Sequence, residues 1–377
     1  MKGPIRLLTL LLFASLFPGL GMVQGREIWT KEKAVAWKAS KPWLVGANYL
    51  PSSAINQLEM WQAESFDPQT IDRELGWAQS LGFTSMRVFL HHLPHEQNAA
   101  EFYKRIDQFL GIAQKHNIGI MFVLFDSCWD PQPKLGKQRA PKAGVHNSGW
   151  VQCPGKDDLM DPKRQKVLED YVRGIIGRFK DDARVQVWDI WNEPDNQNDN
   201  SYGRNHLKQE PAGKVERTLE LLKLAFVWAR EANPSQPITS GVWIGTWPDD
   251  SHLNPTEKAQ LENSDVISYH SYDPLERSRK CVENLRRFGR PILCTEYMAR
   301  PMASTFDPML GFLKEQGVGA YNWGFVAGKS QTQYPWNSWQ KTYKEEPPVW
   351  FHDIFRTQGQ PYRQPEVDYI KKITGAK

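Results

Sequence analysis

The stretch VQVWDIWNEPDN, residues 185–196, decides the fold, because it begins as a buried strand and ends on polar side chains. A continuous apolar run beginning at Val185 is typical of a strand that is covered on both faces, as in a parallel sheet. Pro194 lacks a backbone donor and closes the strand, which leaves Asn192 and Glu193 at its carboxyl end. Catalytic groups of parallel α/β folds lie at this end of the sheet. The stretch therefore predicts an α/β fold with an amide and a carboxylate on its functional face.

Seven further apolar runs of strand length lie along the chain, and stretches of helix length separate them. In the helical stretches the apolar residues recur at spacings of three and four. Eight such β/α units favour a (β/α)8 TIM barrel over an open doubly wound sheet, with residues 26–377 forming one catalytic domain. The seven further runs are residues 42–49, 85–90, 118–126, 237–245, 265–272, 291–297 and 318–325.

Polar and aromatic residues stand where these predicted strands end. A single residue of this kind is commonly a helix cap, an ion-pair partner or a satisfied core group. Their recurrence at the strand ends of one barrel instead favours a shared site. The candidates are Asn48, Arg87, Asp126, Asn192, Glu193, His270, Tyr272, Glu296 and Trp323.

Glu193 and Glu296 end the fourth and seventh runs, so a barrel would place them across its mouth from each other. Two facing carboxyl groups are what glycosidic hydrolysis requires, one protonated to assist the leaving oxygen and one ionised to attack the anomeric carbon. Arg87 and Tyr272 could donate to Glu296 and keep it ionised, while Asn192 could bind the hydroxyl beside the reacting carbon. This chemistry calls for neither a metal nor a cofactor. The 16 tryptophans also suit a carbohydrate substrate, because aromatic faces stack on sugar rings.

Residues 1–25 have the pattern of a cleavable signal peptide, with Lys2 and Arg6 preceding an apolar run. The mature protein is therefore expected to be secreted or periplasmic. Removing these two basic residues lowers the formal charge from +4 to about +2. A charge so close to neutral gives no reason to expect nucleic acid or an anionic membrane as a partner, and no later run is long enough to span a membrane. The oligomeric state stays open.

The cysteines and a histidine cluster allow several structural interpretations. Four cysteines permit three complete pairings in an oxidising compartment, and the preferred bridge joins Cys128 to Cys153 across one loop. The pairing of Cys281 with Cys294 stays open, since Cys294 lies in an apolar run and could be a small core residue. The histidines in FLHHLPHE, residues 89–96, resemble metal ligands, but a proline interrupts the helix that would align them. The favoured interpretation is that one of these histidines, after the second strand, binds a sugar hydroxyl.

The strand-end motifs together resemble the clan A glycoside hydrolases, most of all family five. They are WNEP on the fourth strand, TEY on the seventh, MRVF on the second, HSY on the sixth and a tryptophan on the eighth. The resemblance implies that Glu193 is the acid/base and Glu296 the nucleophile. It makes Trp323 the platform under the sugar at the cleavage site. The supporting set that it implies is Arg87, Asn192, His270 and Tyr272, and Asp126 and Asn48 are added as candidate substrate contacts.

Two segments resemble a bacterial branch of family five that includes β-mannosidases, namely GVHNSGWVQ (144–152) and WGFVAGKSQTQYPW (323–336). We therefore expect an exo-acting, retaining β-glycosidase on short β-1,4-linked mannosyl saccharides. Long connections at residues 127–160 and 326–349 could wall off the non-reducing side of the cleft, or could instead extend an open groove. An endo-β-1,4-glycanase (mannanase, cellulase or xylanase) is the alternative enzyme. A non-catalytic carbohydrate-binding barrel is the alternative of another class.

Overall fold

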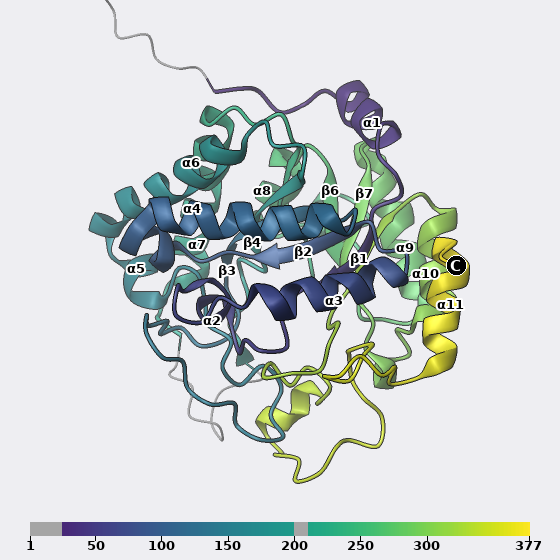
Figure 1. The fold of residues 1–377 in the computed structure, drawn as a ribbon. Coiled ribbons are helices and arrows are strands. Elements are labelled where there is room, and N and C mark those ends of the chain that lie inside the picture. The colour runs from purple at the N-terminus through teal and green to yellow at the C-terminus, as the bar shows by residue number, and fades with distance from the viewer. Residues whose placement is uncertain (1–24, 200–209) are drawn as a thin grey trace, which may run out of the picture.

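The computed structural model describes residues 25–199 and 210–377, so the expected signal segment lies outside the described residues apart from Gly25. Parallel strands form a nearly closed barrel that helices surround, which confirms the predicted (β/α)8 TIM barrel (Figure 1). Each of the eight predicted runs contains one strand. The strands are β1 Val45–Asn48, β2 Ser85–Phe89, β3 Gly119–Asp126, β4 Val185–Asn192, β5 Ile238–Thr239, β6 Ile267–His270, β7 Ile292–Tyr297 and β8 Gly319–Asn322.

The barrel is continuous from β5 through β1 to β6, in the order β5-β4-β3-β2-β1-β8-β7-β6. Strand β5 has only two residues, so the run 237–245 was predicted too long. Val242, beyond its end, closes the gap to β6. Its N–H donates to the Ser268 carbonyl at 3.1 Å, and its carbonyl accepts from the His270 N–H at 2.9 Å.

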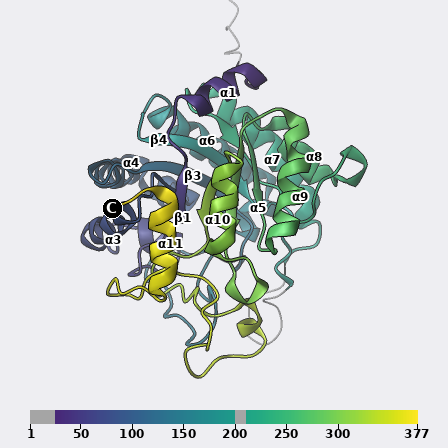
Figure 2. The ribbon, with the colours of Figure 1, turned by 90° about the vertical axis from the view of Figure 1, so that its right-hand side faces the viewer.

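Helices cover the outside of the barrel, as Figure 2 shows for α9, α10 and α11. Several helices begin at a residue whose side chain caps the first free backbone N–H groups. Asp67 accepts from the Thr70 N–H ahead of Pro68 in α3, and Asn254 forms a capping box with Glu257 ahead of Pro255 in α8. None of the helices in the described ranges is long and apolar enough to cross a membrane. The helices are α1 Lys31–Ala39, α2 Gln57–Trp61, α3 Pro68–Ser80, α4 His92–Lys115, α5 Lys156–Met160, α6 Gln165–Phe179, α7 Lys214–Glu231, α8 Pro255–Asn263, α9 Leu275–Leu285, α10 Phe306–Glu315 and α11 Gln364–Thr374.

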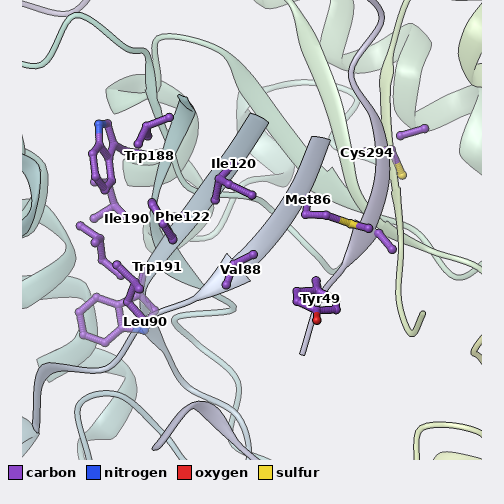
Figure 3. Packing of buried hydrophobic residues seen from close by; sticks show 14 of the residues in the cluster. Tyr49, Met86, Val88, Leu90, Ile120, Phe122, Trp188, Ile190, Trp191 and Cys294 are labelled. Atoms are coloured by element: carbon purple, nitrogen blue, oxygen red, sulfur yellow. The ribbon is translucent and has the colours of Figure 1, made fainter. Parts of the chain in front are cut away.

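Alternate residues of the strands face opposite sides of the barrel wall. On β2, Met86 and Val88 belong to the large cluster between the sheet and the helices (Figure 3). Ser85 and Arg87 point inward, where the Ser85 hydroxyl lies 2.8 Å from that of Tyr321 on β8, two strands away. The barrel interior therefore holds polar groups, most of which find hydrogen-bond partners there.

Two long connections rise from the carboxyl end of the barrel, one between β3 and α5 and one between β8 and α11. They lie side by side at the lower edge of Figure 1. The Asn147 N–H of the first donates to the Ser330 carbonyl of the second at 2.8 Å, and the His146 N–H donates to the Ser338 hydroxyl at 2.9 Å. The two segments therefore form one joint wall above the barrel mouth.

Gly46 on β1 shows how closely the barrel strands approach one another. A Cβ atom there would lie 1.6 Å from the Ser85 carbonyl oxygen, whereas a Cβ at Gly111 of α4 would meet no atom within 4 Å. Because a strand carbonyl cannot move aside, we predict that Gly46→Ala lowers the free energy of unfolding by about 3 to 5 kcal/mol. The control Gly111→Ala should raise it by up to about 1 kcal/mol. Thermal melting of the two variants tests this, and equal melting temperatures would contradict the close approach.

Candidate active site

A cleft opens at the carboxyl ends of the strands and encloses about 650 Å³ of space, its open mouth included. Both predicted glutamates line it, and aromatic rings make up much of its wall. Its lining comprises Cys128, Trp129, His146, Asn147, Trp150, Asn192, Glu193, Asn196, Trp243, His270, Tyr272, Glu296, Trp323 and Trp336.

Glu193 and Glu296 face each other across this cleft. Glu193 follows β4 with a positive φ of 46°, and Glu296 lies in β7. They are 8% and 4% exposed, and an oxygen of each lies within 4.8 Å of the other. A separation near 5 Å is that of retaining glycosidases, whereas inverting enzymes need roughly 6.5 to 9.5 Å to admit a water molecule.

The carboxyl group of Glu296 is held by two donors. Arg87 Nη1 donates to its Oε1 at 2.8 Å, and the Tyr272 hydroxyl donates to its Oε2 at 2.6 Å. Burial raises the pKa of Glu296, and the charge of Arg87 and the Tyr272 hydrogen bond oppose that rise. The donors therefore favour the ionised form in a site whose burial disfavours it.

Glu193 has different neighbours. Asn196 Nδ2 and the Cys128 thiol both donate to its Oε2, at 2.6 and 3.3 Å. Burial raises the pKa of Glu193, and these two hydrogen bonds only partly oppose it. No cation in the described part of the chain donates to Glu193, so its protonated form is favoured more readily than that of Glu296.

His270 lies between the two carboxyl groups. Its Nδ1 is 2.9 Å from Glu193 Oε1, and its Nε2 is 3.6 Å from Glu296 Oε1. Burial lowers the pKa of His270 to about 4, so the ring is neutral and carries one proton. With that proton on Nε2, Nδ1 accepts from a protonated Glu193 while Nε2 faces an ionised Glu296. The ring thereby suits one protonated and one ionised carboxyl group.

Four of the predicted substrate contacts line the cleft, namely Asn192, His270, Tyr272 and Trp323. The other three lie behind its surface. Arg87 is fully buried, Asn48 donates to the Thr295 carbonyl, and Asp126 accepts from Asn192 and Trp150. Their side chains do not line the cleft and instead form hydrogen bonds with groups of the barrel wall. Direct contact of these three residues with substrate stays a prediction.

Several cleft residues escaped the sequence analysis. Asn196 follows β4, and His146 and Asn147 come from the long β3 connection. Asn196 stands three residues after Glu193 and could have been found as a polar residue beside WNEP. His146 and Asn147 lie in a segment whose course depends on distant contacts.

The four cysteines are free, so the preferred bridge between Cys128 and Cys153 is wrong. A backbone bridge pairs Asp126 with Cys153 and fixes the course of both segments. From there the Cys128 thiol points to Glu193, whereas Cys153 Sγ lies 3.4 Å from the His92 Nδ1 atom behind the barrel wall. The two sulfur atoms therefore face different surroundings.

The histidines after β2 do not reach the cleft, so the expectation that one of them binds a sugar hydroxyl is wrong. His91 and His92 are fully buried. With Cys153 they are close enough to share a metal ion, but His91 Nε2 pairs with the Gln152 carbonyl and His92 Nε2 with Asp158. His95 pairs with the Tyr103 hydroxyl. These partners support a structural role.

A (β/α)8 barrel whose mouth holds two facing carboxyl groups in an aromatic cleft defines the glycoside hydrolase class. The chain matches the model of the cellulase family, glycosyl hydrolase family 5, over residues 63–345. It belongs to this family and is an O-glycosyl hydrolase; a retaining mechanism is typical of its clan. No curated protein sequence matched the chain.

Solved structures share the fold at low sequence identity. The exo-β-1,4-mannosidase Op5Man5 from Opitutaceae bacterium strain TAV5 is 22% identical with a TM-score of 0.58, over 89% of this chain and 59% of that one. GH5_18 from Streptomyces cattleya, in complex with Manb1-4GlcNAc, is 12% identical with a TM-score of 0.57, over 89% and 80%. The endo-1,4-β-D-mannanase of Thermotoga petrophila RKU-1 is 14% identical with a TM-score of 0.53, over 89% and 99%. The chain thus spans only 59% of the mannosidase's length.

Cys128 is the one cysteine that lines the cleft, among those in the described residues. We predict that methyl methanethiosulfonate inactivates the enzyme, because a modified Cys128 would crowd Glu193. Inactivation should be slow and should accelerate with pH, since burial raises the pKa of this thiol well above its usual value. Cys128→Ala should resist the reagent, while Cys281→Ser should be inactivated like the wild type. Loss of activity at the same rate in Cys128→Ala would contradict this.

Proposed function

We propose that the protein is a retaining β-glycosidase that removes single sugars from the ends of short β-1,4-linked mannosyl saccharides. The observation that carries the mechanism is the approach of Glu193 and Glu296, whose nearest oxygens lie within 4.8 Å. This leaves room for attack by a carboxylate on the anomeric carbon but not for an intervening water molecule.

In this mechanism Glu296 attacks the anomeric carbon while Glu193 gives its proton to the glycosidic oxygen. The bond between that carbon and oxygen breaks, and a covalent glycosyl ester of Glu296 forms. Glu193, now ionised, removes a proton from water, which attacks the same carbon and releases the sugar with its configuration retained. The raised pKa of Glu193 and the donors on Glu296 support this division of roles.

The remaining cleft residues orient the sugar. Asn192 accepts from Arg87 through Oδ1 and donates through Nδ2 to Asp126 and, more weakly at 3.8 Å, to the Cys128 sulfur. A sugar hydroxyl could replace the sulfur as the acceptor of the second N–H. Trp323 is held at its edges by Phe89 and Trp150, with ring centroids 5.8 Å away in both cases. A rigid ring of this kind suits stacking under the sugar at the cleavage site.

The joint wall of the β3 and β8 connections favours exo action. Trp129, Trp150 and Trp336 from these segments line the cleft, and Trp129 stacks on the buried Trp339 at 5.6 Å. A wall of packed rings blocks the passage of a polymer, so the cleft becomes a pocket for a chain end. An endo-acting mannanase is the second candidate, since the fold also aligns with 99% of the Thermotoga petrophila mannanase.

Two observations support mannose as the terminal sugar. The segments at residues 144–152 and 323–336 resemble the β-mannosidase branch, and the fold is similar to that of the exo-β-1,4-mannosidase Op5Man5 and of GH5_18 bound to Manb1-4GlcNAc. We also propose that the protein is secreted or periplasmic, on the strength of the signal-like pattern in residues 1–25. An oligosaccharide substrate outside the cytoplasm fits both inferences.

The roles of the two glutamates can be separated chemically. Glu296→Gln should lower kcat by about 10⁴-fold or more, and a 2-fluoro mannosyl fluoride should label Glu296 in the wild type. Glu193→Ala should lose least on aryl mannosides with good leaving groups, because these need little proton donation. Azide should restore its turnover and give a β-mannosyl azide. An α-azide, or a label on another carboxylate, would overturn the retaining mechanism.

Product analysis distinguishes exo from endo action. With a pentasaccharide of β-1,4-linked mannose labelled at its reducing end, we expect mannose as the first product, followed by labelled tetra-, tri- and disaccharide in order. The viscosity of a soluble mannan should hardly fall while reducing ends appear, because a pocket cannot cut a polymer internally. Early di- and trisaccharides with a rapid fall in viscosity would favour the endo-mannanase.

A further inference from the structure

Asn147 is a buried polar residue whose side chain has no protein partner. It is 1% exposed, and neither its Oδ1 nor its Nδ2 has a hydrogen-bond partner among the described residues. Burying an amide without partners costs about 1 to 3 kcal/mol per group. Its backbone is nevertheless firmly held, because its N–H donates to Ser330 and its carbonyl accepts from the Trp150 N–H at 3.0 Å.

The backbone of Asn147 adds a second cost. Its φ of 45° lies in the left-handed region, which asparagine tolerates better than most residues but which still requires support from the surroundings. The strain and the unpaired amide occur at one residue of the cleft wall. Such costs are typical of a site that is completed by a ligand.

Asn147 stands where two hollows meet. It lines the cleft, and with Trp150 and Trp323 it also lines a narrow neighbouring hollow that contains Asp353. The side chain therefore borders both hollows that the Trp323 ring lines. In a wall of tryptophans, it offers one acceptor and two donors.

The direction of the bound sugar follows from the proposed roles of the glutamates, on which this inference rests. Glu193 must protonate the leaving oxygen, so the leaving group lies on the side of Glu193 and its neighbours Asn196 and Trp243. The transferred sugar would then lie over Trp323, which shares the lining of both hollows with Trp150 and Asn147. In that pose Asn147 would face hydroxyls remote from the anomeric carbon.

We propose that Asn147 recognises the non-reducing terminal sugar through the hydroxyls on carbons 3 and 4, donating through Nδ2 to one and accepting through Oδ1 from the other. Adjacent hydroxyls match the spacing of an amide group, and both unpaired atoms gain a partner on binding. In a β-1,4-linked chain the oxygen on carbon 4 is a free hydroxyl only at the end. Asn147 would therefore bind a terminal sugar but not an internal one, which makes it a specificity-determining residue for exo action.

The test pairs an enzyme change with a substrate change. The substrates are 4-nitrophenyl β-mannoside and its 4-deoxy and 3-deoxy analogues, and the variant is Asn147→Gly, which keeps the left-handed backbone without the amide. Asn117→Gly is the matched control, since Asn117 is exposed at the end of α4 with a φ of 58°. Asn147→Asp, which keeps the side-chain shape, serves as a second variant if the glycine variant folds poorly.

We expect the wild type to lose about tenfold or more in kcat/KM on a deoxy substrate, and Asn147→Gly to lose about as much on the parent mannoside. On the deoxy substrate Asn147→Gly should lose little more, because the partner of the missing hydroxyl is already gone. Asn147→Asp should also lose activity on the parent, as it cannot donate, while Asn117→Gly should match the wild type.

Two outcomes would overturn the inference. If the losses from the variant and from the deoxy substrate simply multiply, Asn147 does not touch those hydroxyls. If Asn147→Gly and Asn147→Asp keep full kcat/KM on the parent, the amide has no role in recognition. Both outcomes leave the proposed glycosidase standing. Failure of the wild type to hydrolyse any aryl β-glycoside of mannose, glucose or xylose would instead remove the proposed function, and this inference with it.

Discussion

The structure of the active site depends on one buried guanidinium group. All five N–H donors of Arg87 are used, two towards Asp189 Oδ2 and one each towards Asn48, Asn192 and Glu296, at 2.8 to 3.0 Å. The group thereby ties β2 to β1, β4 and β7 in the centre of the barrel. A charge without solvent exposure is tolerated only when it is paired and fully hydrogen-bonded, so the fixed fork of arginine sets the positions of its partners. Because Asp189 already balances the charge, Glu296 receives a donor without being fully neutralised, which fits its raised pKa.

The sequence was sufficient to predict the barrel and the residues at its strand ends, because both follow from local patterns. Apolar runs of strand length and the proline after Glu193 are properties of neighbouring residues. Asp189 was missed, although an aspartate within the buried run at residues 185–192 is a signal that could have revealed a partner for Arg87. Arg87, Asn48 and Asp126 were likewise recognised only from their positions at strand ends. A strand-end position does not tell whether a side chain reaches the cleft surface or supports one that does.

The part of the cleft that the β3 and β8 connections form could not be predicted, since these two segments are distant in sequence. His146 and Asn147 reach the cleft only because the β8 connection holds the β3 connection through Ser330 and Ser338. Nor could composition show that Cys128 faces Glu193 instead of Cys153. Long connections obtain their course from non-local contacts, and the residues that distinguish one glycosidase from another tend to lie in such segments. The barrel positions the two carboxyl groups, while residues of the joint wall shape the cleft around them.

The short strand β5 has a consequence for the dynamics of the site. Between β5 and β6 the barrel is held mainly through Val242, whose carbonyl accepts from the His270 N–H. Regions with few backbone hydrogen bonds open locally at a lower free energy than the rest of a domain. The amide hydrogens of Val242 and His270, which join β5 to β6, should therefore exchange with solvent before those of β2 and β3. Strands β2 and β3 are paired on both sides. Since His270 contacts both carboxyl groups, each such opening would briefly uncouple the two protonation states while the rest of the barrel stays folded.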